Sequence, residues 1–451
     1  MKTKERKKLT IVQKMLIAVV GGVIVGSAFL LLREYMTGHD QTTVWTWINN
    51  ILFQDITKPE GVNAIGLLYI VSEMFMHGLQ LAIVPLVLVS LSLAISSLSD
   101  PEKLGKIALK TIICFLSFYV IGATIAGCAA YFIQGQGWFD VALPASVAQE
   151  TTTIEAYNPL TTLISAIPSN IGSAFSSNNS ILAVVVVALI IGLCMSRLPE
   201  KTEPFKKVLE SLNEIIQYFL NFLINKIGPY AIFCMITRTF AIYGIEYIKP
   251  TFVYIVSTII VSLVIVSTIY PLGVYLTTRL NPFIFMKKVF KIGLFAAATN
   301  SSAATLPINM ETCETELGCS EEISSFVLPT GMTINMNGTT CMHLMAVTFI
   351  AASAGIHVTP ANLVLAAFLS ICTAIGTPAI PVAGTTMVYV VLTGLGFSSD
   401  LVMIGYALVL AMNYIPGMAV ITLNVIGDAA TNVIVSYKEG QLNRDIYNAD
   451  N

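Results

Sequence analysis

Two stretches in the last third of the chain decide its fold: AAATNSSAATLP at residues 296–307 and AIGTPAIPVAG at residues 374–384. Each one interrupts an apolar run with small residues and helix breakers, so neither is typical of a plain spanning helix. Non-helical backbone at membrane depth is tolerated only where protein buries it or where it lines a cavity, and a pair of such segments is the best sequence sign of a transporter's binding site. We therefore predict two re-entrant hairpins whose tips meet near the bilayer midplane. The alternative interpretation is a pair of small-residue seams at which helices pack.

The composition of the whole chain is that of a membrane protein. Of its 451 residues, 55% are hydrophobic and only 11% are charged, and the mean hydropathy is +0.78, whereas a soluble domain carries roughly 25% charged residues. Apolar runs long enough to cross a bilayer recur along the chain and leave no room for a large soluble domain. Lys and Arg are too few to neutralise a row of phosphates, so nucleic acid is excluded as a partner. The partners we expect are the lipid bilayer and a small organic solute.

Apolar runs predict spanning helices at residues 15–32, 74–95, 111–132, 181–195, 219–243 and 252–277, with two more in the last third. The first run is longer than the apolar part of a signal peptide and has no clear cleavage site. Basic residues gather in alternate connectors, at 103–110, 197–207 and 279–291. Because basic connectors face the cytoplasm, we expect a multi-pass protein of the cell membrane with both termini in the cytoplasm.

A polar break lies inside the next apolar region. The run GMTINMNGTT occupies residues 331–340, within a longer stretch that contains no Asp, Glu, Lys or Arg. Unwound backbone there would free carbonyl oxygens, which are the ligands that a hard cation such as sodium prefers. A solvated loop is the alternative, and the apolar flanks on both sides argue against it.

The last predicted span, residues 401–435, holds one charged residue, Asp428. A carboxylate at that depth costs several kcal/mol unless it is paired or binds an ion, so a functional role is the default interpretation. The alternative is a helix-end cap or an interfacial carboxylate, because Asp428 lies only some two turns from the Lys438 end of the span.

Four motifs in this order carry a resemblance: NSSAATLP at 300–307, NMNGT at 335–339, GTPAIP at 376–381 and NVIGD at 424–428. Together they resemble the signature half of the dicarboxylate/amino acid:cation symporter family, which includes sodium-coupled glutamate and neutral amino acid transporters. The N-terminal half agrees more weakly, through IVPLV at 83–87 and the pattern of spans.

The resemblance implies an all-α membrane protein with eight transmembrane helices and two re-entrant helical hairpins, in a glutamate-transporter-like elevator architecture, assembled as a homotrimer. It divides the chain into a scaffold and a transport domain that moves against it. Residues 1–108 would supply two scaffold helices, 109–135 the third helix in the transport domain, 136–250 the fourth and fifth helices for scaffold and trimerisation, 251–438 the sixth to eighth helices with both hairpins, and 439–451 a cytoplasmic tail.

Site residues carried over from the resemblance fall into two sets, and the co-transported sodium ions are the only cofactors we expect. The cation set comprises Gly331, Thr333, Asn335, Asn337, Ala374, Ile375, Thr377, Asn424 and Asp428. One sodium would lie between the carbonyls of Gly331, Asn335 and Asn424 and the Asp428 carboxylate, and a second near Thr333 and the carbonyls of the second hairpin. The substrate set comprises Ser301, Ser302, Thr339, Ile380, Gly384, Gly417, Val420, Ile421 and Asn424. The Ser302 hydroxyl, the Asn424 amide and N–H groups at the hairpin tips would hold a carboxylate, with Thr339 near the distal end.

The departures from the family pattern concern the substrate. Val420 stands where members selective for glutamate and aspartate place an Arg, and Gly417 where amino acid transporters place an Asp for the ammonium group. Asn413 replaces a commonly acidic residue, and Asn300 stands where some members carry an Arg. The solute we expect is therefore a neutral amino acid or a monocarboxylate. A dicarboxylate or acidic amino acid symporter with an unusual site, or an anion-leaking, channel-like member, remains an alternative.

The number of coupled ions also departs from the pattern. Members with a third sodium site use an Asp in the polar break and a Thr-Ser pair on the third helix. This chain has Asn337 in the break, and Phe118 and Tyr119 align with the pair. Since an aromatic pair offers few ligands to a small hard cation, we predict fewer than three coupled sodium ions, or a proton in place of one.

Other function classes lack their motifs. An ATP-driven pump would need the phosphate-binding loop G-x-x-x-x-G-K-[ST], which is missing from the sequence. The four histidines, His39, His77, His343 and His357, show no metal-ligand spacing. We therefore predict a secondary active symporter, which couples sodium or proton influx to solute uptake, and not an enzyme.

Overall fold

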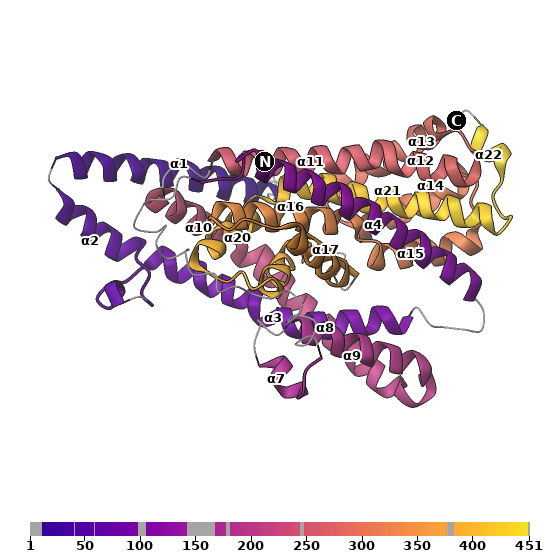
Figure 1. The fold of residues 1–451 in the computed structure, drawn as a ribbon, viewed down its shortest axis with the longest axis horizontal. Coiled ribbons are helices and arrows are strands. Elements are labelled where there is room, and N and C mark those ends of the chain that lie inside the picture. Colours follow the sequence, from indigo (N-terminus) through magenta and orange to yellow (C-terminus); the bar gives the residue numbers. More distant parts are fainter. Residues whose placement is uncertain are drawn as a thin grey trace, which may run out of the picture.

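The computed structural model describes residues 11–39, 41–57, 59–97, 105–141, 167–176, 181–243, 248–375, 377 and 383–449. Within these residues every regular element is a helix (Figure 1). The elements of the first half are α1 (Ile11–Gly38), α2 (Thr42–Leu52), the 3-10 turn η1 (Pro59–Gly61), α3 (Leu67–Ser97), α4 (Gly105–Gly135), α7 (Ile171–Phe175), α8 (Ile181–Arg197), α9 (Pro199–Phe222), the π-helical segment η4 (Leu223–Ile227) and α10 (Gly228–Tyr243). Those of the second half are α11 (Ile248–Val264), the π-helical segment η6 (Ile265–Ile269), α12 (Tyr270–Thr278), α13 (Pro282–Thr299), α14 (Ser302–Thr315), α15 (Glu321–Ile334), α16 (Asn337–Ser353), α17 (Pro360–Ile375), α18 (Ala383–Thr386), α19 (Val388–Gly394), α20 (Asp400–Met412), α21 (Tyr414–Lys438) and α22 (Arg444–Asn448).

Six helices of the described residues are long and apolar enough to cross a membrane: Ile17–Gly38, Leu67–Leu93, Lys106–Gly135, Pro199–Ile242, Lys249–Thr278 and Tyr414–Lys438. Shorter apolar helices run at Ala183–Arg197, Pro360–Ile375, Gly384–Gly394 and Leu401–Leu410. Each of the six runs predicted between residues 15 and 277 lies within a continuous helical stretch. The all-helical membrane class is therefore confirmed, while the count of eight spans and two re-entrant hairpins stays a prediction.

Proline shapes two of the long spans. Pro229 and Pro271 each stand second in a helix, α10 and α12, directly after a π-helical segment. Proline has no N–H to donate, and its ring clashes with the carbonyl four residues back. The wider π turn accommodates both effects without ending the span. In the second case it leaves Tyr270, the residue before the proline, fully buried.

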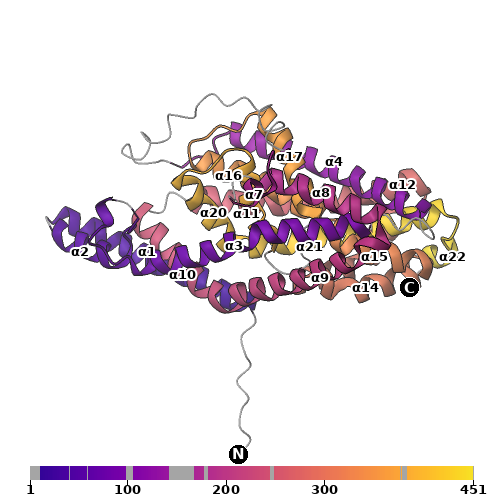
Figure 2. The same ribbon diagram turned by 90° about the horizontal axis from the view of Figure 1, so that it is seen from below.

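The helices pack in two groups, and α16 is the centre of the larger one (Figure 1). In the smaller group α1 packs on α10, and α3 packs on α8, α9 and α10. In the larger group α16 contacts α4, α11, α17, α20 and α21, and all of its residues are buried. Figure 2 shows the same helices from below, with α9 and α10 along one side and α4, α16 and α17 along the other. Helix α4 thus joins the C-terminal helices, although it lies early in the chain.

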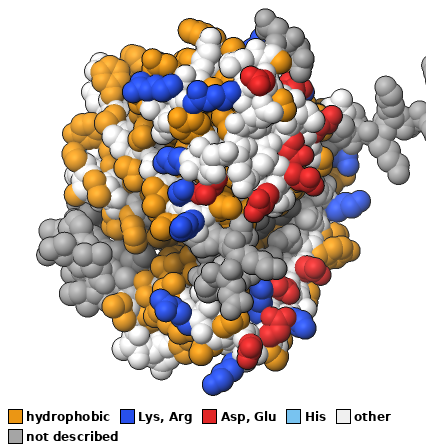
Figure 3. Space-filling model, turned by 90° about the vertical axis from the view of Figure 1, so that its right-hand side faces the viewer, with side chains coloured by type: hydrophobic (Ala, Val, Ile, Leu, Met, Phe, Trp, Pro, Cys, Tyr) orange, Lys and Arg blue, Asp and Glu red, His pale blue; other side chains and the backbone are white. Residues whose placement is uncertain are grey.

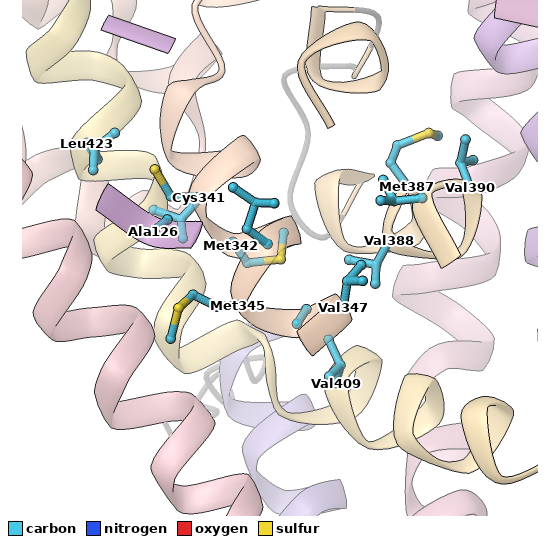
Figure 4. Close-up of a cluster of buried hydrophobic side chains, with 14 of the residues drawn as sticks. Ala126, Cys341, Met342, Met345, Val347, Met387, Val388, Val390, Val409 and Leu423 are labelled. Carbon is cyan, nitrogen blue, oxygen red and sulfur yellow. The ribbon is translucent and has the colours of Figure 1, made fainter. Parts of the chain in front are cut away.

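Apolar side chains hold the larger group together. Figure 4 shows Val347 of α16 close to Val388 of α19 and Val409 of α20, while Met345 lies on the other side of α16, and all of these side chains are buried. Burial of a side chain of this size contributes about 1.5–3 kcal/mol where water is the alternative environment. Close packing around α16 fixes the helices that carry the polar residues of the site.

The first interrupted stretch forms a helix-turn-helix. Helix α13 ends at Thr299, Asn300 adopts a left-handed conformation with φ 49°, and α14 begins at Ser302. Asn tolerates this conformation better than most residues, and α14 then packs back on α13. In the second stretch α17 ends at Ile375 and α19 packs on α17. Most of that turn lies outside the described residues.

The last predicted span is two helices, so the single span at 401–435 was wrong. Helix α20 ends at Met412, and α21 starts at Tyr414. The cause is Pro416, whose ring conflicts with the carbonyl of Met412 four residues earlier. Asn413, at the junction, is buried: it accepts a hydrogen bond from the Tyr254 hydroxyl at 2.7 Å and donates one to Thr385 Oγ1 at 2.6 Å.

The C-terminal segment docks at one end of the molecule. Lys288 of α13, although only 5% exposed, donates hydrogen bonds to the carbonyls of Glu316 at 2.9 Å, Ile446 at 3.0 Å and Tyr447 at 2.8 Å. Tyr447 is fully buried, and burial raises the pKa of its phenol above the ordinary value. Figure 3 shows this end of the molecule, where basic and acidic side chains gather among hydrophobic ones. The mostly exposed segment from residue 440 to 449 is therefore held to α13 through the buried Tyr447 and the bonds of Lys288.

Candidate functional site

The polar break lies where the sequence predicted it. Helix α15 ends at Ile334, α16 begins at Asn337, and Asn335 and Met336 between them have non-helical dihedral angles. The Asn335 N–H still closes the last turn by donating to the Gly331 carbonyl at 2.8 Å. The Gly338 N–H of the next helix donates instead to Asn424 Oδ1, at 2.7 Å. The break therefore places its backbone groups against α21.

Asp428 lies directly beside the break. Asn335 Nδ2 donates to Asp428 Oδ1 at 2.8 Å and lies 3.3 Å from the Asn424 carbonyl. A methyl group on Gly331 would come within 2.6 Å of Asp428 Cγ, so the carboxylate packs against that backbone. All four residues are buried, and Asn335 Oδ1 has no hydrogen-bond partner. We call Gly331, Asn335, Asn424 and Asp428 the charged cluster.

The charged cluster has the chemistry of a site for a hard cation. Among the described residues no basic side chain pairs with Asp428, and it is 3% exposed in the interior of α21. A helix-end cap or an interfacial carboxylate is thereby excluded. The described residues contain no group of three or more His, Cys, Asp or Glu that would suit a transition metal. The oxygen atoms that remain as possible metal ligands belong to one carboxylate, to backbone carbonyls and to an unpaired amide. Such oxygen ligands match sodium in hardness.

The residues of the second predicted cation site, Thr333, Ala374, Ile375 and Thr377, lie less close together than those of the charged cluster. Ala374 is buried against Met336, at the end of α17. Its carbonyl accepts the Thr377 N–H at 3.0 Å, and the Thr377 hydroxyl donates to Thr373 O at 2.9 Å. Thr333 has an exposed side chain that donates to Thr330 O. Ile375 is half-buried beside Ala374. The structure thus places the α17 members near the break, whereas the Thr333 hydroxyl is bonded within its own helix.

Asn337 lies apart from the charged cluster. Its Nδ2 donates to the Tyr270 hydroxyl at 3.0 Å, and Cys341 Sγ lies 3.9 Å from its Oδ1. A methyl group on Gly122 would lie 3.0 Å from Asn337 Cγ and closer still to Asn337 Oδ1. The Phe118 ring stands edge-on to Tyr270 at 4.9 Å. Uncharged side chains therefore fill the space around Asn337, and we call Asn337, Tyr270 and Cys341 the neutral cluster.

At the tip of the first hairpin, Ser301 and Ser302 differ in the hydrogen bonds of their hydroxyl groups. The Ser301 hydroxyl accepts the Ala304 N–H at 3.3 Å and caps α14. Ser302, 3% exposed, has a hydroxyl without a hydrogen-bond partner. Behind them Asn300 packs against Gly417, whose added methyl group would lie 3.3 Å from Asn300 Nδ2. The tip therefore reaches the first turns of α21.

The other predicted substrate residues surround Thr339. Asn424 Nδ2 lies 3.4 Å from Thr339 Oγ1 and 3.3 Å from Met336 Sδ. A methyl group on Gly384 would meet Thr339 Cγ2 at 2.8 Å, and the Val420 carbonyl packs against Gly338. Ile421 is half-buried and packs on the hydrophobic core. Ile380 lies outside the described residues.

Sequence reasoning noted His343 only for its lack of metal-ligand spacing and did not place it near the site. His343 is fully buried, its Nε2 lies 2.7 Å from the Gly384 carbonyl, and its Nδ1 has no partner. The sequence feature that could have placed His343 near the site is its position four residues after Thr339, because residues i and i+4 share a helix face. Met336 was also missed, since a thioether inside a polar motif gives no sign that it will lie against an amide.

The chain is similar to several known transporters. Over 380 residues the chain is 26% identical to the proton/sodium-glutamate symport protein of Bacillus caldotenax. The matched residues make up 83% of this chain and 88% of that protein. It is 28% identical over 386 residues to the L-cystine uptake protein TcyP of Bacillus thuringiensis (strain Al Hakam), covering 82% of each. It is 29% identical over 271 residues to an excitatory amino acid transporter of Caenorhabditis elegans, covering 59% of this chain and 53% of that protein.

A family model described as the sodium:dicarboxylate symporter family matches residues 11–438, nearly the whole chain. Members of this family are secondary transporters and not enzymes. The alignment includes the polar break, both interrupted stretches and Asp428. This chain belongs to the sodium:dicarboxylate symporter family.

Proposed function

We propose that this protein couples sodium influx to uptake of a small solute with one carboxylate and an uncharged distal part. The observation that carries the proposal is the buried Asp428 carboxylate, which has no basic partner among the described residues and faces an unwound backbone. A buried carboxylate without a counter-charge is costly. A sodium ion with the neighbouring Gly331, Asn335 and Asn424 oxygens would neutralise it. Coupling follows because the same Asn424 contributes its side chain to the solute site.

Charge and packing at the break favour fewer than three sodium ions. Asn337 brings no negative charge, and its amide nitrogen points a donor at Tyr270. A donor N–H repels a cation, and the aromatic neighbours leave few oxygen ligands. The first cation belongs in the charged cluster and a second near the carbonyls of Ala374, Ile375 and Thr377. A proton in place of one sodium is the remaining option.

Two helices, α14 and α21, carry hydrogen-bond donors that could bind the solute carboxylate. The Ser302 hydroxyl is buried without a partner, at the N-terminus of α14, where free N–H groups and the helix dipole favour an anion. The Asn424 amide has only a thioether and a distant hydroxyl within reach. A carboxylate would give both donors a stronger acceptor.

The distal part of the pocket determines which solutes are excluded. Gly417 and Val420, on the α21 face that meets the hairpin tip and the break, carry no charge, and Ile421 adds none. A dicarboxylate would bury a second negative charge without a partner, which is prohibitive in a dry site. Neutral amino acids and monocarboxylates fit equally well by this reasoning, because Gly417 offers an ammonium group no carboxylate and hairpin carbonyls would serve it only in part.

The packing supports the family architecture that we propose for the assembly. Helix α4 packs with α16, α17 and α21, while α1, α3, α8, α9 and α10 pack with one another. The larger group would be the transport domain and the smaller group the scaffold of a homotrimer. In this arrangement the chain has eight spans and two re-entrant hairpins in the plasma membrane, with both termini cytoplasmic.

Purified protein in liposomes tests the function. An inward sodium gradient should accumulate labelled solute above its external concentration, and dissipation of the gradient should abolish the accumulation. Uptake that only equilibrates the solute would indicate a channel.

In a competition assay, aspartate and succinate should compete poorly with the solute. Displacement of the solute by either at micromolar concentration, roughly −8 kcal/mol of binding, would overturn the interpretation of Val420. A reversal potential that requires three sodium ions per solute would contradict the ion count.

A further inference from the structure

A buried tyrosine hydroxyl from α4 bonds to the backbone of the polar break. Tyr119 of α4 is fully buried. Its hydroxyl donates to the Ile334 carbonyl at 2.6 Å and accepts the Met336 N–H at 2.7 Å. A phenol has one donor and acceptor lone pairs, so both bonds form at once. One side chain thus satisfies backbone groups on both sides of Asn335.

Neither backbone group has its α-helical partner, although the Met336 N–H also lies 3.0 Å from the Ile334 carbonyl across the break. In an unbroken helix the Ile334 carbonyl would accept from Gly338, but the Gly338 N–H is bonded to Asn424 Oδ1. The Tyr119 hydroxyl offers each group a shorter bond than the two groups make with each other, and at hydrocarbon depth a weakened backbone bond is costly. The break is therefore held between α21, through Asn424, and α4, through Tyr119.

We propose that Tyr119 is a positioning residue of the cation site. Asn335 lies between Ile334 and Met336, the two residues that the Tyr119 hydroxyl fixes. The orientation of Asn335 in turn sets its bond to Asp428. The Tyr119 ring also packs with Met336 and Ala374, at the end of α17. Tyr119 therefore connects both predicted cation groups without being a ligand. This inference rests on the proposed sodium coupling.

The test compares Tyr119→Phe with Tyr254→Phe, which also removes a buried hydroxyl but one that bonds Asn413. Amide hydrogen exchange would be followed in peptides that cover residues 332–338. Sodium affinity would be read from the sodium concentration that gives half of the maximal thermal shift. In Tyr119→Phe we expect faster exchange at this segment and about tenfold weaker sodium affinity. Tyr254→Phe should change neither quantity.

A third variant keeps the test decisive if Tyr119→Phe does not fold. Tyr119→Gln retains a donor and an acceptor and should recover part of the sodium affinity. Faster exchange with unchanged sodium affinity would show a purely structural role and overturn the proposal, as would unchanged exchange. If sodium fails to shift the unaltered protein, the proposed function itself falls. A normal sodium response in the unaltered protein together with an unaffected Tyr119→Phe overturns only the role of Tyr119.

Discussion

The charged cluster and the neutral cluster lie on either side of Gly427, yet they differ in what they leave unpaired. An added methyl group on Gly427 would meet the Tyr270 hydroxyl at 2.6 Å and Asn335 Nδ2 at 2.8 Å. In the charged cluster Asp428 has no cationic partner among the described residues, and Asn335 Oδ1 accepts no bond. In the neutral cluster no side-chain oxygen or nitrogen lacks a partner. Burial and polarity alone therefore do not mark an ion site. An unmatched charge with spare oxygen atoms does.

The largest effect should come from removing the unmatched charge. Asp428→Asn should fold but lose at least about 100-fold in sodium affinity, since the loss of one partner from a buried charge pair costs roughly 3–5 kcal/mol. Sodium-dependent thermal shift and solute binding would measure it. Asp140→Asn, at an exposed carboxylate, is the matched control. Undiminished sodium-dependent binding in folded Asp428→Asn would remove the charged cluster as the cation site.

A smaller loss should follow when the carboxylate is displaced but kept. Gly331→Ala would place a methyl group 2.6 Å from Asp428 Cγ, so either the carboxylate or α15 must shift. We expect about tenfold weaker sodium affinity. The control is Gly127→Ala in α4, where an added methyl group meets nothing within 4 Å. Unchanged affinity in Gly331→Ala would show that the carboxylate tolerates displacement and is not held at a ligand distance.

Asn337→Asp would sharpen the comparison by giving the neutral cluster a charge of its own. Without sodium this buried carboxylate should lower the apparent melting temperature, because nothing in the cluster balances it. Added sodium should recover part of the loss. Asn281→Asp, at an exposed helix N-cap where Asp is equally suitable, should be neutral. Equal stability of Asn337→Asp and the unaltered protein in sodium-free buffer would mean that the cluster already provides cation ligands.

The smallest effect is expected for Tyr270→Phe. It removes the acceptor of the Asn337 amide, worth about 1 kcal/mol of stability. The apparent melting temperature should fall slightly, while sodium affinity should change less than about threefold. A loss of sodium affinity as large as that of Gly331→Ala would show that the neutral cluster takes part in cation binding.

The sequence predicted the polar residues of the charged cluster better than the tyrosine that contacts the break. Asp428, Asn335 and Asn424 stand out because each is a polar residue in an apolar run, which membrane burial makes costly. Tyr119 lies in a run that reads as a plain spanning helix, and its role depends on a backbone break more than two hundred residues away. No local pattern records such a contact.

Helix boundaries were harder to predict than helix existence. Both π-helical segments and the junction between α20 and α21 follow from prolines inside apolar runs. Pro229 and Pro271 leave their spans continuous, whereas Pro416 divides one. Whether a proline widens a turn or ends a helix depends on how the neighbouring helices pack, as at Asn413, where Tyr254 and Thr385 supply hydrogen bonds at the junction.

The docked C-terminal segment has a consequence for biosynthesis. Lys288 precedes Ile446, one of its carbonyl acceptors, by 158 residues. During translation the ammonium group therefore leaves the ribosome long before the backbone that will surround it, and it must stay hydrated at the membrane surface until then. The base of the first hairpin is completed only when α22 arrives. Insertion of the spans and closure of this end are thus separate events in time.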